Sequence, residues 1–252
     1  MIGKEISEIM NRHVEPSSVK GYVEPFCGAL GVLKHMNKVY QNRCVASDIH
    51  SDLIELWKEV QENTFDTPEE VTEDDYNTIK HYSSPNSLKA FVGFGLSFGG
   101  RYFGAYAPKY TNGKKENYLQ AAKNSVNKLH PLIQGVKFTS KSYKNHNHKN
   151  KLIYCDPPYQ QTKFPIKYRT GVKKYDLFNN NEFWEIMRNW SENNIVFISE
   201  TSAPEDFICI WEKVSHRSAA QSKKTRYKSE SDSYANEKLF VHNSVVSKLK
   251  SI

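Results

Sequence analysis

The apolar positions of the first 61 residues follow two patterns of spacing, one typical of helices and one typical of buried strands. Residues 51–61 repeat apolar side chains at intervals of three and four, which predicts a helix with Ser51 as its N-cap. Helical stretches alternate with short apolar runs, and this order predicts a parallel sheet. The predicted elements are a helix at 1–11, a strand at 21–26, a glycine turn and helix at 27–40, a strand at 43–48 and the helix at 51–61.

The pattern changes between residues 62 and 137. This stretch begins acidic, becomes rich in aromatic residues and glycine at 91–110, and turns helical at 116–129. Alternating strands and helices return after it, so we expect an inserted lobe at 62–137 and one α/β core built from 1–61 and 138–252. The later predicted elements are strands at 136–143, 151–156, 195–200 and 237–243 and a helix at 181–193.

Charge along the chain is unevenly distributed. The net charge is +7, and residues 62–75 carry seven acids and no Lys or Arg. Three other stretches carry bases and no acid, namely 76–115, 163–174 and 213–228. Each stretch alone is compatible with a solvated loop, but three such stretches beside candidate motifs favour a nucleic acid as the partner.

Composition excludes several other classes of protein. No apolar run approaches the roughly 20 residues that a membrane helix needs, and residues 1–10 lack the apolar core of a signal peptide. The four cysteines are scattered, which is typical of a reduced, intracellular protein without structural zinc. The His-containing stretch 145–150 has no Cys or acid beside it, so we expect a polar loop and no metal site.

Residues 23–31, VEPFCGALG, indicate a strand, a glycine turn and the start of a helix. Asp48 follows Gly28 by 20 residues, the spacing at which dinucleotide folds place a carboxylate on ribose hydroxyls. The full glycine pattern that packs against a pyrophosphate is absent. A cofactor with an adenosine and no phosphates, such as S-adenosylmethionine, suits this turn better, although a glycine turn with a structural acid has the same pattern.

A second motif, Asp156-Pro157-Pro158-Tyr159, follows the apolar run 152–155. The amine of adenine is a poor nucleophile because its lone pair is delocalised into the ring. A carboxylate at Asp156 and the carbonyl of Pro157 can each accept an N–H and favour the geometry that exposes that lone pair. Tyr159 offers a flat face for a base turned out of its stack. A rigid turn in solvent is the alternative interpretation.

Basic and aromatic side chains alternate between residues 88 and 115, a mixture that suits phosphate contacts and base stacking. A helical mini-core with a charged rim would show the same composition. The predicted DNA contacts here and in the two later basic stretches are Arg101, Tyr102, Lys109, Lys114, Lys173, Lys174 and Arg226.

The order of these motifs resembles the Dam-like D12 class of DNA adenine-N6 methyltransferases over most of the chain. The resemblance rests on EPFCG, on the acid followed by SDLI, on the insertion, and on the DPPY motif. It implies a Rossmann-like class I S-adenosylmethionine-dependent methyltransferase sheet, with the insertion as a mainly helical target-recognition lobe. Double-stranded DNA is the implied partner. The catalytic residues would be Asp156, Pro157, Pro158 and Tyr159, and the cofactor residues Lys4, Glu24, Pro25, Phe26, Gly28, Asp48 and Asp156.

The chain departs from the family pattern at two places. The N-terminal Gly-Gly-Lys motif is reduced to Gly3-Lys4, and the second glycine of the turn is displaced to Gly31, with Leu30 before it. A non-catalytic DNA-binding relic is therefore one alternative, and N4-cytosine or RNA amino methylation are others. A dehydrogenase fits less well because the glycine pattern differs. We expect a monomer in the cytoplasm of a bacterial, phage-infected or virus-infected cell, without membrane contact and with a restriction endonuclease as a possible partner.

Overall fold

The computed structural model describes residues 2–107, 110–111, 114–115, 117–158, 178–216 and 234–250. Within these residues the strands of the main sheet are β1 (Tyr22–Glu24), β2 (Cys44–Asp48), β5 (Lys137–Ser140), β6 (Leu152–Cys155), β7 (Ile195–Glu200), β8 (Phe207–His216) and β9 (Tyr234–His242). They form a seven-stranded sheet in the order β5-β2-β1-β6-β7-β9-β8. A separate short ribbon pairs β3 (Tyr110–Thr111) with β4 (Lys114–Lys115).

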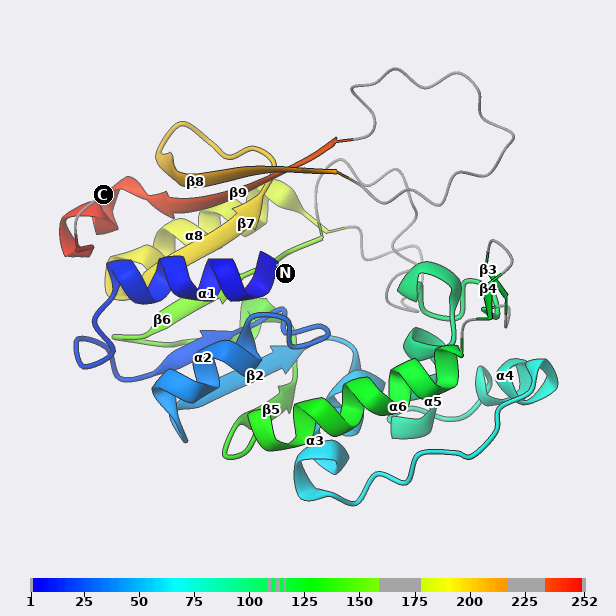
Figure 1. Cartoon of the computed structure of the whole chain (residues 1–252). Helices are drawn as coiled ribbons and strands as arrows, with labels where there is room; N and C mark the ends of the chain where they lie inside the picture. Colours follow the sequence, from blue (N-terminus) through cyan, green and yellow to red (C-terminus); the bar gives the residue numbers. More distant parts are fainter. Residues whose placement is uncertain are drawn as a thin grey trace.

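The sheet is parallel from β5 to β7, and β9 runs antiparallel between β7 and β8. The helices around it are α1 (Ile2–His13), α2 (Leu33–Tyr40), α3 (Ser51–Glu62), α4 (Glu73–Ile79), α5 (Ser87–Gly95), α6 (Tyr118–Leu129) and α8 (Asn180–Asn193). In Figure 1, α1 and α2 lie in front of the sheet and α8 lies behind it, while α4, α5 and α6 gather beyond its right-hand edge. None of the helices in the described ranges has the length and apolar character needed to cross a bilayer.

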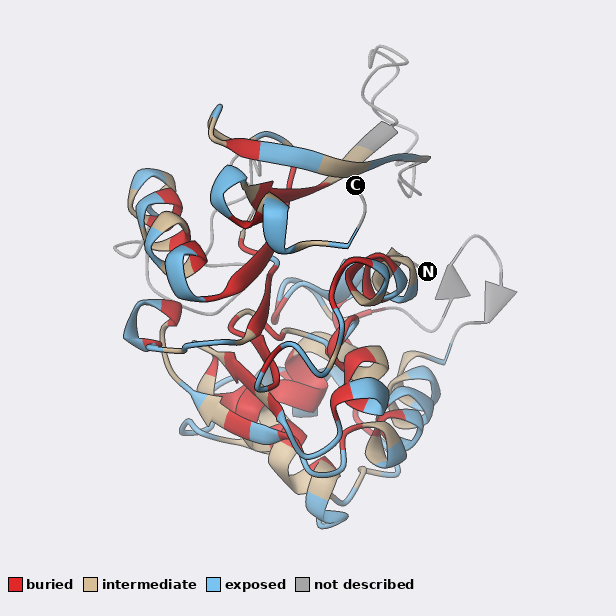
Figure 2. Cartoon of the chain, turned by 90° about the vertical axis from the view of Figure 1, so that its left-hand side faces the viewer, coloured by how far each residue is buried: buried red, intermediate tan, exposed pale blue. Residues whose placement is uncertain are grey.

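Alternating side chains of the central strands bury both faces of the sheet. On β6, Leu152 and Tyr154 join the core with α1 and α2, whereas Ile153 and Cys155 join the core with α8. This alternation follows from the two-residue period of a strand, and a strand covered on both faces is apolar throughout. Figure 2 shows the result, with buried strands enclosed by helices whose outer faces are exposed.

The segment between α3 and β5 shares the core of the sheet. Phe91 of α5 and Leu129 of α6 belong to the same apolar cluster as Leu53 of α3. Its first helix, α4, begins with a capping box, in which Thr72 and Asp75 satisfy each other's backbone N–H groups. This segment therefore packs on the sheet's own helices rather than around an apolar centre of its own.

Most predicted elements occur within a few residues of their expected bounds, and two expectations were wrong. The N-cap of α3 is His50, whose extended backbone precedes the helix, and Ser51 is already helical. His50 makes no capping bond with its side chain. The second error is β8, a long edge strand that the sequence pattern did not predict, because its exposed apolar and polar residues do not alternate.

Candidate active site at the carboxyl edge of the sheet

The turn after β1 presents open backbone at two glycines. Gly28 has a φ of +44°, in the left-handed region that strains residues with a side chain. A Cβ added to Gly28 or to Gly31 would meet no other protein atom within 4 Å. The backbone of this turn therefore faces space that a bound molecule can occupy.

Leu30 holds the position between these glycines without a loss of structure. Its φ is +60°, and its side chain is fully buried in the core. Its N–H donates to the carbonyl of Cys27 at 2.8 Å, which closes the turn. Burial of the leucine offsets the left-handed strain, so the displaced glycine changes the turn's sequence and not its closure.

Asp48, at the end of β2, binds the turn directly. Its Oδ2 accepts from the N–H of Gly28 at 3.1 Å, and its Oδ1 accepts from the N–H of His50 at 3.0 Å. Burial raises the pKa of this carboxyl, and the two backbone bonds oppose that shift. An ionised carboxylate has about four acceptor sites, so Asp48 retains capacity for the hydroxyls of a ligand.

Two residues of this site were not predicted as functional. The indole N–H of Trp57 donates to the carbonyl of Gly28 at 2.9 Å, so side chains hold both the N–H and the carbonyl of that glycine. Ile49, beside Asp48, leaves 53% of its surface exposed and offers an apolar contact at the same edge. The helical pattern placed Trp57 only on the apolar face of a helix. For Ile49 the available signal was an apolar residue directly after the candidate acid Asp48 and beyond the end of the predicted strand.

Glu24 ends β1 and is almost completely buried. Burial raises its pKa to about 8, the nearby charge of Asp156 adds to the rise, and a hydrogen bond from Tyr22 opposes it. The carboxyl groups of Glu24 and Asp156 thus lie close enough, where their strands end, for the charge of Asp156 to raise the pKa of Glu24. A positively charged ligand would relieve this repulsion, as the sulfonium of S-adenosylmethionine would.

Asp156, Pro157 and Pro158 leave the sheet next to that glutamate. β6 pairs with β1 in parallel register, so the carboxyl ends of these strands lie side by side. Asp156 is exposed while Pro157 is buried, which fixes the backbone just after the acid. The hydroxyls of Tyr154 and Ser199 lie 2.8 Å apart and tie β6 to β7. Tyr159 lies outside the described residues.

The other predicted cofactor residues are placed less directly. Gly3 lies against the turn, since an added Cβ would be 2.4 Å from the carbonyl oxygen of Gly31. Lys4 is exposed and pairs with Glu8 at 3.5 Å on the surface of α1. Pro25 is buried. The ring of Phe26 packs on aromatic rings of the α8 face, namely Tyr143, Phe178 and Phe183.

The predicted DNA contacts are only partly visible. Arg101 is exposed, whereas Tyr102 is buried and donates to Oδ2 of Asp52 at 2.8 Å. Tyr102 thus joins the insertion to α3, and its contact with DNA stays a prediction. Lys114 lies in β4 with only its backbone described. Outside the described residues lie Lys109, Lys173, Lys174 and Arg226.

The histidines of residues 145–150 bind each other and the sheet. Nδ1 of His146 lies 2.7 Å from Nε2 of His148, and Nε2 of His146 lies 2.8 Å from the hydroxyl of Ser47. Burial lowers the pKa of His146 to about 4. Across the described residues no three His, Cys, Asp or Glu side chains gather in a way that could hold a metal ion.

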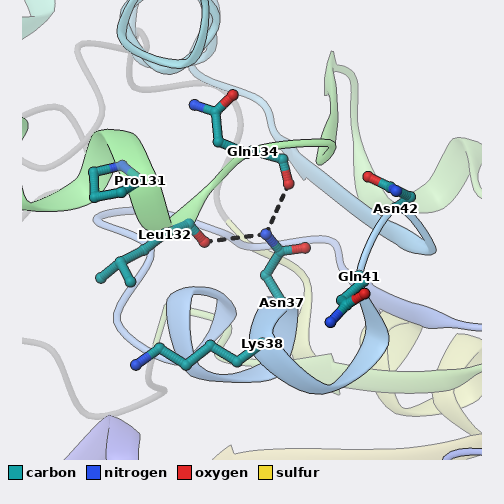
Figure 3. A pocket seen from close by; sticks show the side chains of 7 residues that line it. All are labelled: Asn37, Lys38, Gln41, Asn42, Pro131, Leu132 and Gln134. Carbon is teal, nitrogen blue, oxygen red and sulfur yellow. Dashed lines mark hydrogen bonds between the residues drawn. The ribbon is translucent and has the colours of Figure 1, made fainter.

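A hollow of about 270 Å³ lies at the opposite edge of the sheet. It opens between the end of α2 and the chain before β5, where Asn37 donates to the carbonyls of Leu132 and Gln134 (Figure 3). These segments precede β2 and β5, so the hollow is at the amino ends of the strands. Ligands of open parallel sheets bind at the carboxyl ends, and the hollow is not part of the candidate site.

The sheet order, the glycine turn and its acid agree with the predicted Rossmann-like class I methyltransferase fold, whose methyl donor is S-adenosylmethionine. The residues fit this cofactor: the open glycines, the carboxylate of Asp48, the exposed Ile49 and the two acids suit an adenosine that carries a sulfonium. Residues 2–94 match the sequence model of the D12 class N6 adenine-specific DNA methyltransferase family. That match confirms the predicted resemblance, and it covers the glycine turn and Asp48 but ends before Asp156.

The chain is also similar to solved structures of methyltransferases, at low sequence identity. A putative RNA methyltransferase from Pyrococcus horikoshii is 7% identical, with a TM-score of 0.40, and the alignment covers 96% of this chain and 81% of that one. An rRNA methyltransferase from Streptomyces viridochromogenes is 9% identical, with a TM-score of 0.39 and coverage of 98% and 86%. A search of the curated proteins found no match.

Proposed function

We propose that this methyltransferase acts on N6 of adenine in double-stranded DNA, on a base turned out of the helix. The observation that carries the proposal is the position of Asp156-Pro157-Pro158 beside the glycine turn, through the parallel pairing of β6 with β1. The family match over residues 2–94 supports the choice of DNA and of adenine.

Asp156 and Pro157 would orient the exocyclic amine of the target base. The Asp156 carboxylate accepts one N–H, and the carbonyl of Pro157 accepts the other. Both bonds strengthen as the amine nitrogen becomes tetrahedral, so they stabilise the transition state more than the ground state. Pro157 is buried, its ring fixes its φ, and the following Pro158 restricts its ψ, so its carbonyl is held in place before the base arrives.

The cofactor supplies an electrophilic methyl group when it is bound. Asp48 would accept from ribose hydroxyls, Gly28 and Gly31 would allow close approach of the ligand, and Ile49 would cover an apolar face of the adenine. Glu24 would lie near the positive charge, and Lys4 is the remaining proposed contact. These residues bind and orient, and none of them forms a covalent bond.

DNA would lie against the insertion and the carboxyl edge of the sheet. Arg101 lies just after α5, on the segment proposed as the target-recognition lobe (62–137). Phosphate contacts from the basic stretches would position the duplex, with Tyr159 stacking on the turned-out base. The protein would act as a monomer.

The test uses purified protein, S-adenosylmethionine and unmethylated genomic DNA, followed by mass spectrometry of the digested nucleosides. Asp156→Ala is the inactive variant, and Asp66→Ala is the matched control at an exposed aspartate. We expect N6-methyladenine with the wild type and the control, and none with Asp156→Ala.

Other outcomes would change the proposal in defined ways. N4-methylcytosine would keep the amine mechanism and change the base. Product on RNA with none on DNA would change the nucleic acid, since phosphate contacts do not select the sugar. A wild type that binds duplex DNA but yields no modified nucleoside would be a binding relic, and the proposal would be wrong.

A further inference from the structure

We propose that α3 couples DNA binding to cofactor binding, with Asp52 as the positioning residue that fixes the insertion relative to the cofactor turn. This inference rests on the proposed function, because it takes the insertion to be the part that contacts DNA. It is carried by two sets of hydrogen bonds made by residues 48–57, which comprise the end of β2 and the first two turns of α3. One set reaches the insertion, and the other reaches Gly28.

Toward the insertion, the buried carboxylate of Asp52 gathers three hydrogen bonds from distant parts of the chain. Its Oδ2 accepts from the hydroxyl of Tyr102 at 2.8 Å and from that of Ser84 at 3.0 Å. Its Oδ1 accepts from the N–H of Asn86 at 2.9 Å, and Nζ of Lys89 lies 3.9 Å from Oδ2. A carboxylate this buried would be costly without such partners, so the insertion is held in one position by several bonds at once.

Toward the cofactor turn, the same short stretch of chain binds Gly28. Asp48, four residues before Asp52, accepts from its N–H, and Trp57, five residues after Asp52, donates to its carbonyl. Both anchors therefore lie within a span of ten residues that includes the first two turns of α3. Asp52 and Trp57 lie on the same α-helix, which is stiff over this length, so a shift of the insertion that carries Asp52 with it also moves Trp57.

Ring contacts reinforce this junction. The ring of His50, between Asp48 and Asp52, packs edge-on against the rings of Tyr102 and of Phe94 in α5. The ring centroids are 4.5 Å apart for Tyr102 and 5.1 Å apart for Phe94. Burial lowers the pKa of His50, so the ring is neutral at this apolar contact. His50, two residues after the proposed cofactor-binding acid Asp48, thus contacts the insertion directly.

Two sites that share one stiff element influence each other when a ligand at either site favours one position of that element. If DNA favours the position of the insertion that Asp52 holds, it also favours the arrangement of Gly28 and Asp48 that binds the cofactor. Linkage makes this influence reciprocal, with coupling factors that are typically about 5-fold to 150-fold. Loss of a bond between the insertion and Asp52 would reduce the coupling while leaving the cofactor turn itself intact.

The experiment measures the Kd of S-adenosylhomocysteine, which cannot donate a methyl group, by calorimetry with and without sheared unmethylated duplex DNA. Tyr102→Phe and Ser84→Ala each remove one bond to Asp52 and keep most of the packing. Tyr76→Phe is the matched control, because its hydroxyl lies 2.6 Å from that of Ser97, inside the insertion. Both tyrosines are buried, so the two Phe variants remove comparable groups.

We expect DNA to lower the wild-type Kd by at least about 5-fold. In Ser84→Ala the ratio of the Kd without DNA to the Kd with DNA should fall to within about 2-fold of unity, with the Kd measured without DNA unchanged. Tyr102→Phe should lower the same ratio at a DNA concentration that saturates the variant, so that a weaker DNA contact is not taken for lost coupling. Tyr76→Phe should keep the wild-type ratio. Wild-type coupling in both Asp52-contact variants, or a wild-type Kd indifferent to DNA, would overturn the inference alone. Absence of S-adenosylhomocysteine binding in the wild type would overturn both this inference and the proposed function.

Discussion

The phenol of Tyr22 donates a hydrogen bond of 2.6 Å to Oε2 of Glu24, inside the first strand of the sheet. The bond favours the ionised carboxylate, but burial outweighs it and raises the pKa of Glu24 to about 8. The charge of Asp156 contributes to this rise because the two acids end neighbouring strands. The folded protein therefore holds a proton on Glu24 over a pH range in which the unfolded chain has lost it.

Glu24 should make the protein less stable as pH rises from about 4.3, the ordinary pKa of a glutamate, toward about 8. In that window the folded state binds more protons than the unfolded state, so the free energy of unfolding falls by at most about 1.4 kcal/mol per pH unit. Glu24→Gln removes this dependence. Urea unfolding at about pH 5.5, 6.5 and 7.5 should show a wild type that loses stability relative to the variant.

Glu8→Gln is the control for this measurement, because Glu8 is exposed on α1. It should keep the wild-type slope. Parallel pH profiles for the wild type and Glu24→Gln would show that Glu24 does not hold a proton in the folded state.

Trp57→Phe should weaken cofactor binding about tenfold. The variant keeps an aromatic ring in the core of α3 but loses the indole N–H that holds the carbonyl of Gly28, a bond whose net contribution is about 1–1.5 kcal/mol. Calorimetric titration with S-adenosylmethionine measures the change. Trp190→Phe on α8 is the control and should leave the Kd unchanged, since Trp190 packs on His146 on the other face of the sheet. An unchanged Kd in Trp57→Phe would remove Trp57 from the cofactor site.

Sequence reasoning located the strands of the core because these strands are buried on both faces and read as continuous apolar runs. It located Asp48 and Asp156 because an acid directly after such a run is chemically conspicuous. It missed the roles of Trp57 and Asp52 for a physical reason: their partners are 29 residues away for Trp57 and up to 50 residues away for Asp52. A helical pattern shows which face is buried but not which backbone atom or hydroxyl that face meets.

His146 should give a pH dependence of the opposite sign at lower pH. Burial, together with the charges of Lys141 and His148, lowers its pKa to about 4, so the folded ring stays neutral while an unfolded histidine is protonated below about 6.5. The stability it contributes is present above about pH 6.5 and is lost as the pH falls toward 4. Because Glu24 acts with the opposite sign in part of this window, the comparison is with the wild type: His146→Gln should lose less stability than the wild type as the pH falls from about 6.5 toward 4. A variant that keeps the full wild-type acid sensitivity would place its origin elsewhere.

Leu30→Gly tests whether burial or backbone strain dominates at the glycine turn. Glycine would relieve about 1–2 kcal/mol of left-handed strain at a φ of +60°. It would also remove a fully buried leucine side chain, and the loss of such a side chain costs about 2–5 kcal/mol even when alanine replaces it. Glycine further increases the freedom of the unfolded chain. The free energy of unfolding should therefore fall by about 2–4 kcal/mol, measured by urea titration. Leu30→Met keeps the volume and should cost less than about 1.5 kcal/mol. If the glycine variant is as stable as the wild type, the free energy of backbone strain at this turn is as large as the free energy gained by burying the leucine side chain. Burial would then not be the dominant effect at this position.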